Sequence, residues 1–207
     1  AEGYRLACAA RVDGDIRIMH TNPIGDAQIL TGGQGGVVEI LPSIQKKYVE
    51  ITYPSAHDQR DDISRLIDTL GEEECNFPLP MLTILPDLLR NSDFKVTVVY
   101  SGENIVDVES GNTEICGYGI AVDIGTTTVV VYLVDLYSGK QMDVLSELNS
   151  QKAFGGDVIA RIQHTMQHED GLHQLQTRII TQLNHMIEAI LSKNSISQQN
   201  VYSMVLV

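Results

Sequence analysis

The chain contains no tryptophan, only three phenylalanines and three cysteines, and 14 Lys or Arg residues against 27 Asp or Glu residues. A net charge of −13 with scattered basic residues argues against nucleic acid or anionic membranes as partners, because binding to phosphate backbones requires clustered Lys and Arg. No apolar run approaches the roughly 20 residues of a membrane helix. The cysteines are odd in number and far apart, which argues against a disulfide framework and leads us to expect a cytoplasmic protein.

The most informative stretch of the sequence is Gly119–Thr128, which reads GIAVDIGTTT and is followed by the apolar run VVVYLV. It predicts a buried strand that ends on the carboxylate of Asp123, a tight turn, and a second strand running back. Gly125 permits a turn with positive φ, and Thr126, Thr127 and Thr128 are small enough to approach phosphate closely. We therefore predict that Gly125 to Thr128 cradle the phosphates of a nucleotide, and that Asp123 holds Mg²⁺ through water.

The bland alternative for this stretch is an ordinary hairpin whose threonines simply favour strands. A run of Asp-x-Gly-Thr-Thr-Thr between two apolar strands makes that interpretation the weaker one. The motif is not a Walker loop, because the chain contains no Gly-x4-Gly-Lys-Ser/Thr.

Composition and periodicity divide the chain into four parts. Residues 1–20 are short β segments, residues 21–46 form a glycine-rich linker, and residues 47–116 form a small α+β middle domain with a helix predicted over 58–70. Residues 117–207 are an α/β segment with three strands, two helices over about 156–167 and 168–193, and a last strand over 201–207.

A second candidate position is Asp157, in the sequence FGGDVIAR that ends at Arg161. An Asp at a helix start is explained by capping alone, because it accepts hydrogen bonds from unpaired N–H groups. The functional alternative places Asp157, with Asn149 and Gln151, near an attacking water or Mg²⁺. We carry Asp123 and Asp157 forward as candidate catalytic residues.

The Asp123–Thr128 motif resembles the first phosphate loop of the superfamily that contains acetate and sugar kinases, heat-shock chaperones and actin. The order strand, strand, strand, helix, strand over 118–207 is similar to the start of each half of that actin-like (ribonuclease H-like) ATPase fold. This resemblance implies that ATP lies between two such halves, of which the chain holds one.

The segment Tyr4–Cys8, YRLAC, resembles the last ligand segment of a plant-type [2Fe–2S] ferredoxin domain, which makes Cys8 a candidate metal ligand. Its three partner cysteines are missing, so this chain cannot complete a cluster. As a lone cysteine in a strand, Cys8 is equally explained as a buried thiol.

The order of ferredoxin tail, linker, middle domain and ATPase start is similar to that of the reductive activators of corrinoid proteins, as are the stretches YPSAHDQ at 53–59 and VDIGTTT at 122–128. The resemblance implies transfer of one electron from a [2Fe–2S] cluster to the Co(II) corrinoid of a methyltransferase system, driven by Mg²⁺ and ATP. It also leads us to expect a homodimer and a chain that is a fragment of a longer protein, inactive by itself.

Two alternatives remain open from the sequence. One is a small-molecule kinase with the same cleft, although a kinase has no reason to begin with a ferredoxin tail. The other is a non-catalytic module that dimerises through the middle domain and binds nothing by itself.

Overall fold

The computed structural model describes residues 14, 42, 44–71 and 76–207. The chain divides into two units, Ala1–Gly33 and Gln34–Val207, and all of the helices and strands described below lie in the second unit. The predicted hairpin over 1–20 and the candidate ligand Cys8 lie outside the described residues.

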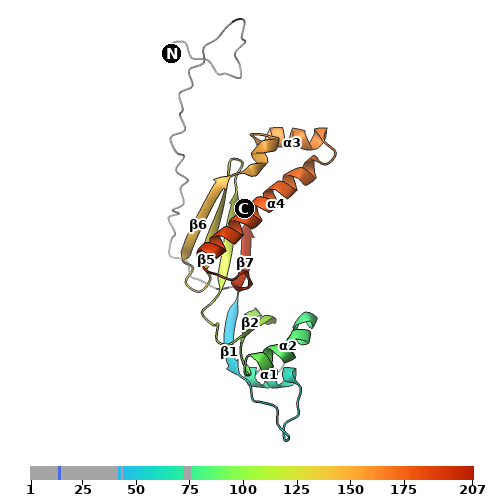
Figure 1. Cartoon of the computed structure of the whole chain (residues 1–207), viewed down its shortest axis with the longest axis vertical. Helices are drawn as coiled ribbons and strands as arrows, with labels where there is room; N and C mark the ends of the chain where they lie inside the picture. The colour runs from blue at the N-terminus through green and yellow to red at the C-terminus, as the bar shows by residue number, and fades with distance from the viewer. Residues whose placement is uncertain (1–13, 15–41, 43, 72–75) are drawn as a thin grey trace. The chain divides into compact units, whose positions relative to one another are not determined.

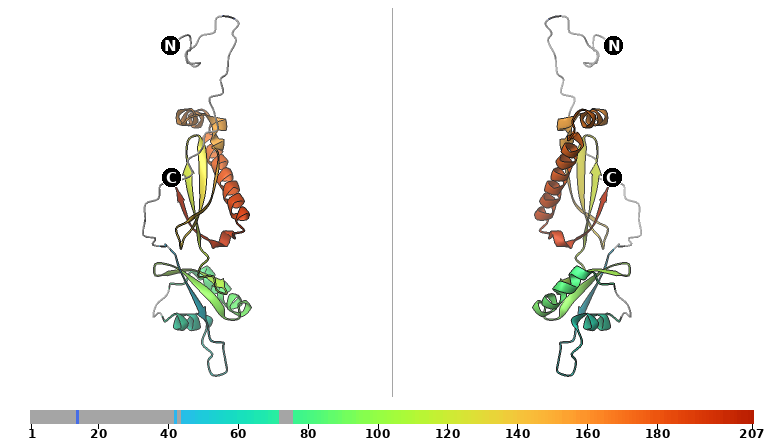
Figure 2. Two further views of the ribbon diagram at one scale, coloured as in Figure 1. Left: turned by 90° about the vertical axis from the view of Figure 1, so that its left-hand side faces the viewer. Right: turned by 90° about the vertical axis from the view of Figure 1, so that its right-hand side faces the viewer.

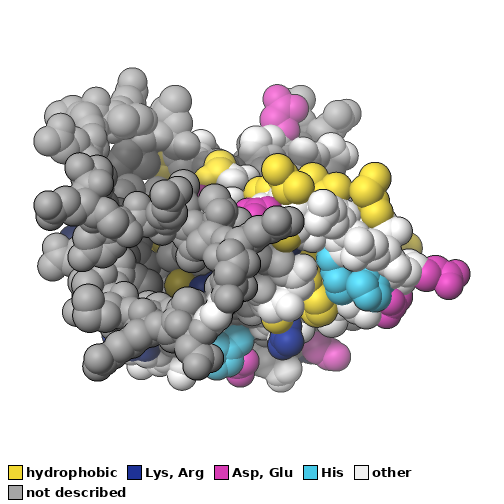
Figure 3. All heavy atoms as spheres, turned by 90° about the horizontal axis from the view of Figure 1, so that it is seen from above, with side chains coloured by type: hydrophobic (Ala, Val, Ile, Leu, Met, Phe, Trp, Pro, Cys, Tyr) yellow, Lys and Arg dark blue, Asp and Glu magenta, His cyan; other side chains and the backbone are white. Residues whose placement is uncertain are grey.

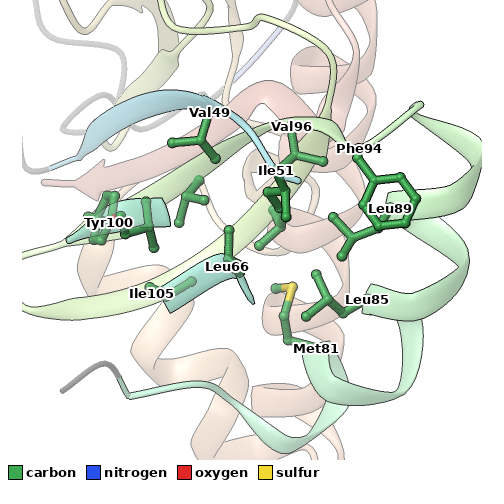
Figure 4. Packing of buried hydrophobic residues seen from close by; sticks show 13 residues of the cluster. Val49, Ile51, Leu66, Met81, Leu85, Leu89, Phe94, Val96, Tyr100 and Ile105 are labelled. Atoms are coloured by element: carbon green, nitrogen blue, oxygen red, sulfur yellow. The ribbon is translucent and has the colours of Figure 1, made fainter. Parts of the chain in front are cut away.

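The first sheet of the second unit is antiparallel and has the strand order β1-β2-β3. Its strands are β1 (Gln45–Glu50), β2 (Lys95–Ser101) and β3 (Asn104–Ser110). Two helices, α1 (Asp62–Leu70) and α2 (Leu79–Asn91), pack against the sheet around one apolar core (Figure 4). Leu66 and Leu85 are completely buried in that core, and burial of such side chains stabilises a fold by about 2 kcal/mol each.

The helix expected over 58–70 begins four residues later than predicted, at Asp62. Asp61 is its N-cap, because a carboxylate oxygen of Asp61 accepts from the Ser64 N–H at 2.9 Å. The preceding residues form a separate turn in which the backbones of Ser55 and Asp58 exchange two hydrogen bonds of 3.1 Å. The helix ends at Gly71, whose φ of 74° is the left-handed conformation that glycine adopts without strain.

The second sheet has four strands in the order β6-β5-β4-β7. They are β4 (Tyr118–Ile124), β5 (Thr128–Asp135), β6 (Gln141–Leu148) and β7 (Val201–Leu206), and β7 runs parallel to β4. A short 3-10 helix, η2 (Ser150–Phe154), precedes α3 (Val158–Gln167) and α4 (Gly171–Lys193), and η3 (Gln198–Asn200) leads into β7. The predicted fold class, an α+β domain followed by an α/β sheet with this element order, is confirmed.

Helix α4 lies across one face of the four-stranded sheet (Figures 1 and 2). Apolar side chains from β4, β5 and α4 form its core; they are Ile120, Val122, Val129, Val131, Leu133, Leu183, Met186, Ile190 and Leu191. Successive side chains of a strand point to opposite faces. Ile120 and Val122 face α4, so Asp123 lies on the face that α4 leaves open.

Helix α3 exposes much of its apolar surface. Val158, Ile159, Ile162 and Met166 are all at least half exposed. The face seen from above in Figure 3 accordingly shows a row of hydrophobic side chains with histidines beside it. Within the described residues, no helix is long and apolar enough to span a membrane.

Candidate functional site

The turn between β4 and β5 consists of Gly125, Thr126 and Thr127. A Cβ atom added to Gly125 would lie 2.9 Å from the carbonyl oxygen of Thr128, which is closer than a real side chain tolerates. Glycine is therefore required by a close backbone approach. The expected positive φ at Gly125 is wrong, because Gly125 is not among the described glycines in the left-handed region, which are Gly71, Gly102, Gly111 and Gly139.

Three consecutive carbonyl groups of this turn are held by the protein. The Asn149 side-chain amide donates to Gly125 O at 2.9 Å, and the backbone N–H of Asn149 donates to Thr127 O at 2.8 Å. The Arg161 guanidinium donates to Thr126 O through Nη2 at 2.6 Å. All three carbonyls point into the body of the domain.

The N–H groups of the turn are left free by this arrangement. In a planar trans peptide, the C=O of one residue and the N–H of the next point in opposite directions. Fixing the carbonyls of Gly125 and Thr126 therefore turns the N–H groups of Thr126 and Thr127 away from Asn149 and Arg161. Neither N–H, nor that of Gly125, has a hydrogen-bond partner among the residues that the structure describes. Successive free N–H groups of this kind form an anion-binding concavity.

The side chains at the turn are also available to a ligand. The carboxylate of Asp123 is exposed and forms no hydrogen bond or ion pair within the described part of the chain. The hydroxyl groups of Thr126, Thr127 and Thr128 likewise take no partner within 44–71 and 76–207. Carboxylate and hydroxyl oxygens suit Mg²⁺ and its bound waters, so the donor set fits a Mg²⁺–phosphate ligand.

Asn149 and Gln151 do not lie where the sequence interpretation placed them. Asn149 is 1% exposed and supports the turn from beneath, while its Oδ1 accepts from the Gln151 N–H at 2.9 Å. The Gln151 side chain donates to the carbonyl of Leu175 in α4 at 3.0 Å. Both residues hydrogen-bond to other protein groups and thereby link η2 to the turn and to α4. The prediction that they face water or Mg²⁺ is therefore wrong.

Asp157 is the N-cap of α3. Its Oδ1 accepts from the Ala160 N–H at 2.8 Å, and the residue is exposed. This geometry is what capping requires. A catalytic role for Asp157 stays a prediction.

Arg161 is the site residue that the sequence interpretation missed. It lies one turn into α3 and is 9% exposed. Besides Thr126 O, its guanidinium contacts Gly155 O at 3.1 Å and Gln151 Oε1 at 3.4 Å. A Cβ on Gly155 would lie 2.8 Å from Ala160, so Gly155 is the local signal that the chain passes close to α3 here.

The described residues contain one free cysteine and no cluster of metal-binding side chains. Cys116 is a free, half-buried cysteine. Among the described residues, no group of three or more His, Cys, Asp or Glu side chains could hold a metal ion.

Comparison with known proteins identifies both regions of the chain. Residues 33–115 match the model of the RACo linker region, and residues 118–207 match that of the RACo middle region. The chain belongs to the RACo family. The segment that the sequence analysis treated as a middle domain is thus the RACo linker region, and the α/β segment is the RACo middle region.

Two relatives support this assignment. The chain is 41% identical over 149 residues to the corrinoid activation enzyme RamQ of Eubacterium limosum, which covers 63% of this chain and 25% of RamQ. It also resembles a solved structure of a reductive activator for corrinoid, iron-sulfur protein, with a TM-score of 0.67, 34% identity, and coverage of 83% of this chain and 28% of that one. The chain therefore spans about a quarter of the length of each of these two relatives.

Proposed function

We propose that this chain is the linker and middle part of an ATP-dependent reductive activator that returns Co(II) corrinoid proteins of a methyltransferase system to Co(I). The observation that carries the nucleotide part is the β4–β5 turn, whose carbonyls are held by Asn149 and Arg161 while the N–H groups of Gly125, Thr126 and Thr127 have no partner among the described residues. The corrinoid part is supported by the RamQ and reductive-activator relatives.

In this proposal the turn binds the phosphates of Mg-ATP. The N–H groups of Gly125 to Thr127 and the nearby threonine hydroxyls donate to phosphate oxygens. Asp123, at the end of β4, would hold Mg²⁺ through a bound water, and Asp157 would orient the attacking water. Binding and hydrolysis then shift the protein between states that differ in affinity for the corrinoid partner, which makes a low-potential reduction accessible.

The electron source belongs to the same proposal. A [2Fe–2S] cluster would supply one electron at low potential, and Cys8 would be one of its ligands. A plant-type cluster needs four cysteines and this chain has three, at positions 8, 75 and 116. The chain by itself therefore does not fit a complete cluster, and we assign it no step in electron transfer. A homodimer in the cytoplasm remains part of the proposal.

The test uses the full-length protein that contains this chain. It is mixed with a Co(II) corrinoid protein and a low-potential reductant, and the Co(I) absorbance is followed with and without Mg-ATP. We expect Co(I) to accumulate only with Mg-ATP, and Asp123→Asn to reduce the ATP-dependent rate by about 10- to 100-fold, the loss typical when an outer-shell partner of a metal ion is replaced. ATP turnover without Co(I) would leave the phosphate site in place and overturn the corrinoid assignment.

A further inference from the structure

The buried guanidinium of Arg161 has no negative partner in the described part of the chain. Its three contacts are the carbonyls of Thr126 and Gly155 and the amide oxygen of Gln151, all of them neutral. No carboxylate within residues 44–71 and 76–207 lies within 4 Å of Arg161, although the chain has 27 acidic residues.

This arrangement satisfies hydrogen bonds without balancing charge. Taking a charged group out of water is costly, and proteins normally offset the cost with an opposite charge. Buried arginines are accordingly almost always paired. A cation that is nine-tenths buried against neutral acceptors therefore leaves a positive potential in its surroundings, and its surroundings include the β4–β5 turn.

The Arg161 guanidinium acts on one particular peptide group of the turn. Arg161 Nη2 holds Thr126 O at 2.6 Å, and the peptide that carries this carbonyl also carries the N–H of Thr127 on its other side. The bond polarises that peptide, because a charged donor on the carbonyl makes the N–H a stronger donor. The free N–H of Thr127 is thus both aimed and strengthened by Arg161.

We propose that Arg161 is a positioning residue for the phosphates of a nucleoside triphosphate, acting through the Thr126 carbonyl and as the site's uncompensated positive charge. This inference rests on the proposed function. It assigns Arg161 no contact with the substrate, and its effect reaches the ligand through the peptide between Thr126 and Thr127.

The test compares Arg161→Lys with Arg161→Met in the full-length protein. Both replacements have an unbranched side chain that fills similar space, but only lysine keeps a charge and a donor. Affinities for Mg-ATP and for adenosine, which has no phosphate, are measured by titration calorimetry, together with the thermal midpoint of unfolding. The control is Arg65→Met, which removes the other arginine that is buried among the described residues and that pairs with Asp58 at 2.8 Å in the linker region.

We expect Arg161→Met to weaken Mg-ATP binding by about 10-fold or more, and Arg161→Lys to retain affinity within about threefold of the unchanged protein, as loss of a charged hydrogen bond predicts. Adenosine affinity should be the same in both variants. Arg65→Met should lower the thermal midpoint and leave Mg-ATP affinity unchanged.

Three results would overturn the inference. One is equal Mg-ATP affinity for Arg161→Lys and Arg161→Met, which would remove the role of charge. Another is an equal loss of adenosine and Mg-ATP binding, which would make Arg161 a packing residue only. If the unchanged protein does not bind Mg-ATP, the proposed function itself fails, and that result is distinct from the other two.

Discussion

The two regions of this chain each bury one arginine, and they treat its charge in opposite ways. In the linker region, Arg65 is 2% exposed and its Nη1 lies 2.8 Å from an oxygen of Asp58. It also donates to the carbonyls of Asp58 and Arg60. In the middle region, Arg161 has only neutral acceptors within the described residues.

The difference separates a structural role from one directed at a ligand. The Arg65–Asp58 pair fixes the turn before α1 to the helix, and its charges cancel within the fold. The Arg65–Asp58 pair has no free charge or donor to offer a ligand, because the guanidinium is both neutralised and hydrogen-bonded within the fold. Arg161 donates its hydrogen bonds to neutral groups, and within the described residues neither its charge nor the N–H groups of the adjacent turn have a partner. Burial is common to both arginines, so the absence of a counter-charge within the described residues is what distinguishes Arg161.

The largest loss of Mg-ATP affinity is expected from a substitution in the turn whose Thr126 carbonyl Arg161 holds. Gly125→Ala places a Cβ 2.9 Å from Thr128 O, so the turn must shift and the N–H groups lose their alignment. We expect Mg-ATP affinity to fall by about 100-fold, equivalent to about 2.7 kcal/mol, measured by equilibrium titration.

The matched control for Gly125→Ala is Gly156→Ala in the same region. A Cβ at Gly156 meets no atom within 4 Å, and we expect its affinity to stay within about twofold. If Gly125→Ala and Gly156→Ala bind Mg-ATP with equal affinity, the aligned N–H groups are not the phosphate site. The difference between Arg65 and Arg161 would then have no bearing on ligand binding.

The turn was predictable from sequence because its signal is local. Asp123, Gly125 and the three threonines lie within six residues, and the flanking apolar runs specify two paired strands that this turn connects. The supports of the turn were not predictable, because Asn149 and Arg161 lie 24 and 35 residues away from the carbonyls that they hold. No periodicity indicates which polar side chain of a later element will meet a given carbonyl.

The start of α1 illustrates a second limit. Asp58, Asp61 and Asp62 all suit the first turn of a helix, so composition permits several starting points. The structure selects Asp61 as the cap, since Asp58 is already engaged by Arg60 and the buried Arg65. The contacts of the Asp58 carboxylate with side chains two and seven residues further on therefore leave Asp61 to start the helix.

An intermediate effect is expected from the two capping aspartates, one in each region. Asp61 caps α1 and Asp157 caps α3, each by accepting an N–H three residues on, at 2.9 and 2.8 Å. Asparagine caps nearly as well as aspartate, so Asp61→Asn and Asp157→Asn should each change the free energy of unfolding by less than about 0.5 kcal/mol. If Asp157 also orients water, Asp157→Asn alone should lower ATP turnover, by about 10-fold.

Steady-state ATPase assays of both variants of the full-length protein distinguish the two roles of Asp157. Unchanged turnover in Asp157→Asn would restrict this residue to capping, as for Asp61. The linker and middle regions would then differ at the turn and at Arg161 but not at their helix caps.

The smallest effect is expected at an ion pair in the middle region whose two charges neutralise each other. It joins Asp143 of β6 to Lys193 at the end of α4, with a separation of 2.8 Å. The Lys193 ammonium and then the Asn194 amide lower the pKa of Asp143 to about 2. A carboxyl whose pKa is lower in the folded than in the unfolded protein adds stability above its unfolded pKa, near 4, and this contribution disappears as the pH falls through about 2. Urea midpoints measured between about pH 5 and pH 2 should therefore decline less steeply for Asp143→Asn than for the unchanged protein.

Because the Lys193 side chain is 70% exposed, salt should weaken the effect of this ion pair on stability, whereas salt should affect the buried Arg65–Asp58 pair less. An identical pH dependence in both proteins would show that this pair contributes nothing measurable, and Arg65–Asp58 would remain the model for a charge that the fold itself neutralises.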